Sequence, residues 1–103
     1  MNYMKQRKRS SLEIRCDILS VVAEAPQRKT WILYKANLNL TSLHRHLMAL
    51  MEHDLIAENI TGNGNTKRYT YCITPKGVDI QHYCRLIQKA FDPGAERPSD
   101  TSS

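Results

Sequence analysis

The sequence of 103 residues has no apolar run that approaches the roughly 18–20 residues needed to cross a bilayer. Its basic N-terminus is not followed by the apolar segment of a secretory signal, so we expect a cytoplasmic protein. Cysteine is also scarce: Cys16, Cys72 and Cys84 are odd in number and form no CxxC pair. We therefore interpret them as small hydrophobic residues rather than as a disulfide framework or a zinc site.

Signatures of catalysis are missing as well. The sequence has no glycine-rich phosphate loop, no paired carboxylates in a candidate cleft and no Cys/His pair at an informative position. We accordingly expect no enzymatic activity, no metal, no cofactor and no small-molecule ligand. The hydrophobic fraction of 41% and charged fraction of 24% are typical of a soluble globular protein. The length suits one domain with a modest core that would gain from a partner.

The positive charge is concentrated at the N-terminus. Residues 1–10 contain Lys5, Arg7, Lys8 and Arg9 and no acid, which gives a charge of +4. Residues 11–91 hold 10 basic and 7 acidic residues, or +3, and residues 92–103 carry −2. A basic arm on a mildly basic body favours a polyanion as partner, although a solvated tail would have the same composition.

The most informative stretch, residues 30–56, predicts two helices joined by an Asn-Leu-Asn corner. In the second helix the apolar residues recur at helical spacing and fall on one side, namely Leu40, Leu43, Leu47, Leu50 and Met51. The opposite side carries Thr41, Ser42, Arg45, Met48, Ala49 and Glu52, and the two hydroxyl residues suit a helix N-terminus. This pattern is typical of a helix-turn-helix, but an ordinary pair of core helices would share it.

The preceding residues predict another helix, which begins after Ser10 and Ser11 with Glu13 in its first turn and stops before Pro26. Its expected apolar faces comprise Leu12, Cys16, Leu19 and Ala23 on one stripe and Ile14, Ile18 and Val21 on the next. Thr30 can cap the helix that follows. The four bulky residues after it, Trp31, Ile32, Leu33 and Tyr34, are expected to fill the core.

The residues after the corner helix change to strand period. Residues 55–60 alternate loosely, residues 61–66 form a turn rich in Gly and Asn, and Tyr69, Tyr71 and Ile73 alternate with Thr70 and Cys72. Thr74 and Pro75 then predict the start of a last helix, which Asp92-Pro93-Gly94 ends. We divide the chain into a disordered basic arm (1–9), a helical and hairpin domain (10–74), a C-terminal helix (75–91) and a disordered tail (92–103).

The order helix, helix, helix, hairpin, helix resembles the small archaeal winged helix-turn-helix DNA-binding proteins, of chromatin-associated or regulatory type, that dimerise through a C-terminal helix. The resemblance covers roughly residues 11–90. It rests on Ser11-Leu12-Glu13-Ile14, Leu33-Tyr34-Lys35-Ala36-Asn37-Leu38, residues 50–56 and Tyr71-Cys72-Ile73-Thr74-Pro75-Lys76-Gly77. It implies an α+β, mainly α fold: a winged helix-turn-helix of three helices and a β-hairpin wing, with an added C-terminal helix. Those relatives often continue the last helix into a long coiled coil, whereas Pro93-Gly94 cuts it short here.

The function that we predict is double-stranded DNA binding, in a transcription regulator or a nucleoid-associated chromatin protein. The exposed face of residues 41–53 would enter the major groove, with Arg45 as the main base reader. His44 and His46 point apart by about 200°, so one metal ion cannot take both, and phosphate contact or solvent exposure is expected for each. The full set of predicted DNA-binding residues is Thr41, Ser42, His44, Arg45, Ala49, Asn63, Asn65, Lys67, Arg68, Lys5, Arg7, Lys8 and Arg9.

The last helix is expected to form a homodimer. Its predicted seam is the stripe Ile80, Cys84, Ile87 and Phe91. Tyr83 and Leu86 lie beside this stripe and are expected to cover the domain's own core. Tyr83 is also included among the predicted dimerisation residues. Two other classes of function remain open from the sequence: a winged helix that binds protein in a larger assembly, and one that binds RNA.

Overall fold

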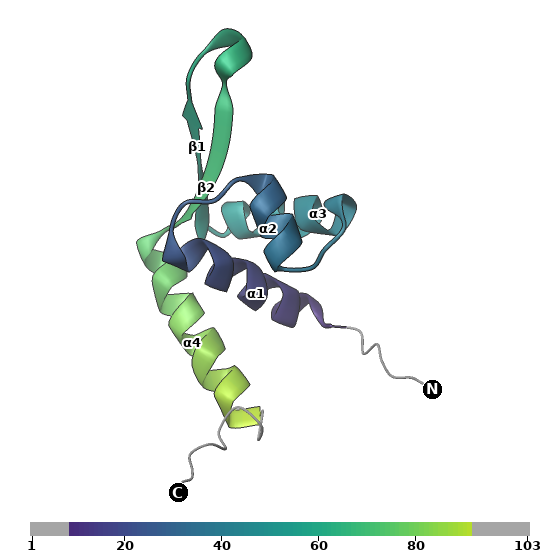
Figure 1. Cartoon of the computed structure of the whole chain (residues 1–103). Helices are drawn as coiled ribbons and strands as arrows, with labels where there is room; N and C mark the ends of the chain where they lie inside the picture. The colour runs from purple at the N-terminus through teal and green to yellow at the C-terminus, as the bar shows by residue number, and fades with distance from the viewer. Residues whose placement is uncertain (1–8, 92–103) are drawn as a thin grey trace, which may run out of the picture.

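A computed structural model of the chain describes residues 9–91. Its elements are α1 (Ser11–Glu24), α2 (Lys29–Lys35), α3 (Leu40–Glu52), β1 (Ile56–Thr61), a single 3-10 turn (Gly64–Thr66), β2 (Arg68–Ile73) and α4 (Pro75–Phe91). The first three helices form the body, the hairpin projects from one side of it, and α4 extends away on another side (Figure 1). The predicted fold class is confirmed, since the chain is mainly helical with one two-stranded antiparallel hairpin.

The hairpin keeps a regular register from Ile56 opposite Ile73 to Thr61 opposite Arg68. Gly62 and Gly64 at its tip have φ angles of +77° and +56°, which side chains with a Cβ rarely adopt, so the glycines permit the turn. A short bridge fixes the foot of the hairpin to the segment between α1 and α2. In this bridge the Gln27 and Tyr71 amides each donate to the other's carbonyl oxygen, at 2.9 and 2.8 Å.

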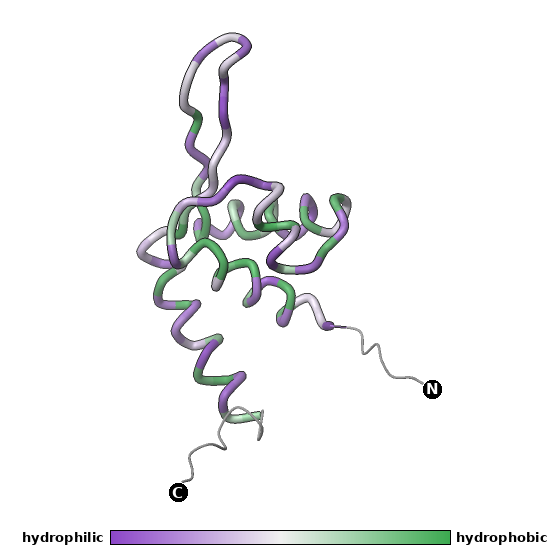
Figure 2. The backbone as a smooth tube through the Cα atoms, viewed as in Figure 1, coloured by the Kyte–Doolittle hydropathy of each residue, from purple (hydrophilic) through white to green (hydrophobic). Residues whose placement is uncertain are grey.

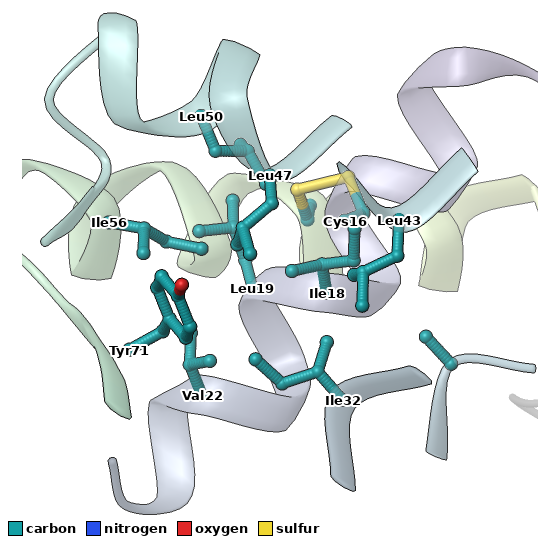
Figure 3. Packing of buried hydrophobic residues seen from close by; sticks show 12 residues of the cluster. Cys16, Ile18, Leu19, Val22, Ile32, Leu43, Leu47, Leu50, Ile56 and Tyr71 are labelled. Carbon is teal, nitrogen blue, oxygen red and sulfur yellow. A yellow bond between two sulfur atoms is a disulfide. The ribbon is translucent and has the colours of Figure 1, made fainter. Parts of the chain in front are cut away.

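The core lies where α1, α2 and α3 meet the foot of the hairpin (Figure 3). Helix α1 is its centre because it buries residues on two adjoining sides and contacts each of the other helices and β2. The buried hydrophobic residues are Cys16, Ile18, Leu19, Val22, Ile32, Ala36, Leu43, Leu47, Leu50, Ile56, Tyr71 and Cys84. Two of the residues predicted on the apolar stripe of α1, Leu12 and Ala23, are exposed because they lie near the helix ends, beyond the neighbouring helices.

The prediction that four consecutive bulky residues of α2 fill the core was wrong for two of them. Ile32 is fully buried and Leu33 is partly buried, but Trp31 is 46% exposed and Tyr34 is 74% exposed. Successive residues of a helix point about 100° apart, so one face cannot accommodate all four. Leu40, placed on the apolar stripe of α3, is likewise exposed, because it lies in the first turn of that helix.

The helix caps follow the predictions in part. Ser10 caps α1 in a capping box with Glu13, and Thr74 accepts a hydrogen bond from the Gly77 amide at the start of α4, as expected. Thr30 does not cap α2, because the helix already begins at Lys29. The N-cap residue is Arg28, and its side chain makes no capping hydrogen bond. The cap of α3 is Asn39, whose Oδ1 accepts from the Ser42 amide at 2.8 Å, so the predicted capping role of Thr41 and Ser42 was wrong.

The joint between the hairpin and α4 explains the Thr-Pro-Lys-Gly motif. Besides capping α4, the Thr74 hydroxyl donates to the Asp54 carbonyl oxygen at 2.6 Å. A Cβ at Gly77 would overlap the Leu55 carbonyl oxygen, so only glycine allows the first turn of α4 to lie this close to the corner after α3. The direction in which α4 leaves the body is therefore fixed at its first turn.

A disulfide between Cys16 and Cys84 ties α1 to α4, which corrects the interpretation of these cysteines as unpaired hydrophobic residues. The two Cα atoms are 5.7 Å apart, within the usual range for a disulfide, although 68 positions separate them in the sequence. Cysteine spacing alone could not reveal the pair, because only the packing of α4 along α1 brings the two side chains together. Cys72 is the free cysteine among the described residues.

His46 is buried, contrary to the prediction of phosphate contact or solvent exposure, with only 1% of its surface accessible. Its Nδ1 accepts a hydrogen bond from Nε of Arg15 on α1 at 3.1 Å. Burial, followed by the charges of Arg15 and Arg45, lowers the pKa of His46 below its ordinary value near 6.5. The neutral imidazole is therefore the form that the folded state favours.

We expect the free energy of unfolding to decrease as the pH falls through the range just below 6.5. In this window the unfolded chain takes up a proton at His46 that the folded chain resists, so stability is lost as the pH falls through 6.5. Urea unfolding at several pH values measures the slope, which should be smaller in His46→Gln, a variant that keeps an acceptor for Arg15. His44→Gln, at an exposed position of the same helix, should keep the wild-type slope. Equal slopes in all three proteins would contradict the assignment to His46.

Candidate nucleic-acid interface

The outward face of α3 presents most of the residues that were predicted to read DNA. Thr41, His44 and Arg45 are exposed, and Ser42 and Ala49 are half-buried at the edges of this face. The helix is held by its other side, where Leu43, His46, Leu47 and Leu50 are buried. Asn37, with a φ angle of +55°, turns the chain between α2 and α3, a conformation that asparagine tolerates better than most residues.

Arg45 projects from this face without an ion pair to any residue that the structure describes. Glu52 is the first acid on α3, and it lies in the last turn, away from the N-terminal half that would lead into a groove. The leading half of the helix is thus free of negative side chains. It can approach a polyanion without like-charge repulsion.

The wing supplies a second group of polar and basic side chains. Asn63, Asn65, Lys67 and Arg68 are all exposed at or next to its tip. The turn is held internally, because the Thr66 hydroxyl donates to the Asn63 carbonyl oxygen at 2.8 Å and accepts from the Asn63 amide at 3.2 Å. In Figure 2 the wing above the body is mostly purple or white, apart from a short green band.

Arg28 joins this basic group, which the sequence did not indicate. A shallow hollow of about 300 Å³ is lined by Arg28 together with Asn65, Thr66, Lys67, Arg68 and Tyr69. The bridge between Gln27 and Tyr71 brings Arg28 next to wing residues that are more than 35 positions away in the sequence. The sequence could not predict this contact, because a single hydrogen-bonded bridge leaves no local pattern. The only local signal in the sequence was the adjacent pair of cations, Arg28 and Lys29, which follows α1.

The predicted basic arm is described only at its last residue. Lys5, Arg7 and Lys8 lie outside the described residues. Arg9 is not free: its Nη1 pairs with Asp17 Oδ2 at 2.8 Å, and its Nη2 donates to the Asn37 carbonyl oxygen at 2.8 Å. Arg9 is therefore held beside the corner between α2 and α3, and the ion pair with Asp17 offsets its charge.

The apolar face of α4 differs from the predicted seam in two respects. Cys84 is buried in the domain by its disulfide to α1, so it is not available for a partner. Tyr83 and Leu86, expected to cover the domain's own core, are instead exposed. The exposed apolar residues on this side of the helix are Ile80, Tyr83, Leu86, Ile87 and Phe91, which we call the α4 face. Hydrophobic segments accordingly continue along α4 away from the body (Figure 2).

No helix within residues 9–91 combines the length and hydropathy that a membrane span requires. The same residues contain no group of three or more His, Cys, Asp or Glu side chains placed to hold a metal ion.

Comparisons with known proteins agree with this arrangement. The family model described as "Winged helix-turn-helix" matches residues 8–91. Sso10a-2, a DNA-binding protein from Sulfolobus solfataricus, is 27% identical over 80% of this chain and 81% of its own, with a TM-score of 0.66.

A PadR family transcription regulator from Clostridium difficile is 15% identical over 79% of this chain and 92% of its own, with a TM-score of 0.71. A MarR family transcriptional regulator from Silicibacter pomeroyi is 16% identical over 84% of this chain and 57% of its own, with a TM-score of 0.68. At such identities the likeness to these two regulators concerns the fold. A comparison with curated proteins found no match.

Proposed function

Because this chain belongs to the winged helix-turn-helix family, we propose that it binds double-stranded DNA and acts as a transcription regulator or a small nucleoid-associated chromatin protein. The observation that carries the proposal is the outward face of α3, where Thr41, His44 and Arg45 are exposed and no acid precedes Glu52. Two solved structures of similar fold are described as transcription regulators and a third as a DNA-binding protein.

In this proposal α3 enters the major groove, which is about 12 Å wide and admits one helix. Arg45 reads base edges, since its guanidinium can donate to the two acceptors of guanine. Thr41, Ser42, His44 and Ala49 lie along the same face and contact bases or phosphates. Glu52, at the far end, stays away from the strands.

The wing and the connector before α2 hold the backbone. Lys67 and Arg68 with Arg28 form a cluster of cations around one hollow, and Asn63 and Asn65 lie at the wing tip. Contacts from these residues and from Lys5, Arg7 and Lys8 would go to phosphates, which fix position but carry no sequence information. Arg9 would serve mainly to anchor the arm beside the helix-turn-helix corner.

The protein would act as a homodimer through the α4 face. Ile80, Tyr83 and Ile87 are spaced three and four residues apart, the spacing of a helix-helix seam, and Phe91, 83% exposed, extends it to the end of the helix. A surface this apolar on a helix that leaves the body is typical of a subunit contact. In this division of roles residues 10–74 read DNA and residues 75–91 form the dimer.

We expect Arg45→Ala to weaken binding to a preferred duplex by roughly 1–3 kcal/mol and to relax the preference at one or two base pairs. Lys67→Ala and Arg68→Ala should instead weaken binding to all sequences alike, because phosphate contacts do not depend on sequence. Fluorescence anisotropy with a selected duplex and a random duplex, each over a range of salt, separates the two effects.

The salt series also tests the proposal as a whole. The logarithm of affinity for duplex DNA should fall linearly with the logarithm of salt concentration, and each lost phosphate contact should reduce the slope by about 0.9. Arg45→Ala with unchanged affinity and preference would place α3 outside the groove. A wild-type protein without salt-dependent duplex binding would favour the protein-binding alternative.

A further inference from the structure

The outward face of α2 carries two exposed aromatic rings that the duplex-binding surface does not use. The ring centroids of Trp31 and Tyr34 are 6.0 Å apart, and both side chains are exposed. The Lys35 ammonium lies over the Trp31 ring, 5.4 Å from its centroid. Exposed aromatic rings side by side on a small polar domain are typical of a binding surface.

The aromatic face continues into a groove that ends at the wing. One shallow hollow, of about 360 Å³, lies between Trp31 and the segment 26–30. A second, of about 420 Å³, is lined by residues 28–30 with Glu58, Tyr69 and Tyr71, and the third is the basic hollow at the wing. Arg28 lines all three hollows, and neighbouring hollows also share Thr30 or Tyr69, so the three adjoin one another along a path from Trp31 to the wing. Figure 1 shows the connector between α1 and α2 crossing the foot of the hairpin.

The charge along this path is positive. The cations that line the three hollows are Arg28, Lys29, Lys67 and Arg68. The acid in the groove is Glu58, whose Oε2 accepts a hydrogen bond from the Tyr71 hydroxyl at 2.7 Å, and Lys29 lies over the Tyr71 ring at 5.9 Å. Tyr69, 44% exposed, provides a further accessible ring in the middle of the path.

Alternating cations and exposed rings in an open groove are the features with which proteins hold single-stranded nucleic acid. The cations follow the phosphates, and the rings stack on bases whatever their sequence. A duplex cannot use the rings in this way, because its bases are already stacked. We propose that the groove from Trp31 to Arg68 binds single-stranded nucleic acid, with bases stacked on Trp31 and Tyr69 and phosphates on Arg28, Lys67 and Arg68. This binding does not require α3 to enter a major groove.

Trp31 is the only tryptophan, so its fluorescence reports directly on stacking. Titration of the full chain with oligodeoxythymidylate, and with the RNA oligonucleotide of matching sequence, should quench it. Quenching by either strand supports the groove, and a comparison of the two identifies the preferred sugar. Absence of quenching by both, at a salt concentration low enough for tight duplex binding, would overturn the proposal.

The matched variants are Trp31→Leu, Trp31→Phe and Val78→Ala. By anisotropy with labelled strands, Trp31→Leu should weaken single-strand binding about 5- to 150-fold, the usual range for one stacking side chain, and change duplex affinity less than about twofold. Trp31→Phe keeps a smaller ring and should lose less. Val78, an apolar residue of α4 that is exposed to a similar extent, should have no effect. An equal loss of duplex and single-strand binding in Trp31→Leu would assign Trp31 to the duplex surface and overturn the proposed single-strand site.

Discussion

Ile87→Asp should sediment as a folded monomer at micromolar concentration, whereas the wild-type protein should sediment as a dimer. Ile87 lies in the middle of the α4 face and is 48% exposed in the single chain, so the substitution should not disturb the domain itself. In a symmetric dimer it would bring two carboxylates together near the two-fold axis. Burial of unpaired like charges is costly enough to separate the subunits.

The same substitution should reduce affinity for an inverted-repeat duplex by roughly a hundredfold or more, although it changes no residue of the proposed DNA surface. Two reading helices held together bind the second half-site as an intramolecular event, at an effective concentration that reaches millimolar. The simplest target has half-site centres about 34–36 Å apart, one turn of the duplex.

Val78→Asp is the matched control for this experiment. Val78 is 49% exposed, close to the value for Ile87, and lies nine residues away on the same helix. Nine residues make about two and a half turns, so the two side chains point to opposite sides. Val78→Asp should remain dimeric and bind DNA normally. A dimeric Ile87→Asp protein would place the seam elsewhere, and a monomeric wild type would remove both the dimer and the palindromic site.

Reduction of the disulfide between Cys16 and Cys84 should lower the free energy of unfolding by about 2–4 kcal/mol. The bond closes a loop with a sequence separation of 68, and a loop of this size restricts the unfolded chain strongly. It also attaches α4 to α1, the helix at the centre of the core. Urea unfolding with and without dithiothreitol measures the difference.

Two variants make this measurement specific. The double variant Cys16→Ala, Cys84→Ala should be as unstable as the reduced wild-type protein, with and without dithiothreitol. Its free energy of unfolding should therefore not change when dithiothreitol is added. Cys72→Ser removes the free cysteine of the described residues, and it should keep the full response. If dithiothreitol leaves the wild-type unfolding midpoint unchanged, the two cysteines are not joined in solution.

The sequence predicted elements whose signals are local. Pro26 marked the end of α1, and Ser10 with Glu13 marked its start. The Thr74-Pro75 pair marked the beginning of α4, and a cluster of Gly and Asn marked the tip of the wing. Each signal acts through backbone geometry or a hydrogen bond within a few residues, so it can be read without knowledge of the rest of the chain.

The candidate surfaces were predicted less completely, because each depends on which side of an element faces a neighbour. The position of Arg45 on the outward face of α3 followed from helical period, and the structure agrees that it is exposed. The same reasoning placed Tyr83 in the core and Cys84 on the seam, and both assignments were wrong. Helical period gives the relative directions of side chains, whereas the packing of α4 on α1 decides which direction is inward.

The sequence by itself thus determined the order of the helices and the hairpin, the caps of α1 and α4, the turn of the wing and the amphipathic pattern of α3. Only the tertiary structure decided that Cys16 meets Cys84, that His46 is buried against Arg15, and that Arg28 lies beside the wing. These pairs are separated by 68, 31 and about 40 positions. The free energy of such contacts depends on how whole helices pack, and no pattern within a short window of sequence contains that information.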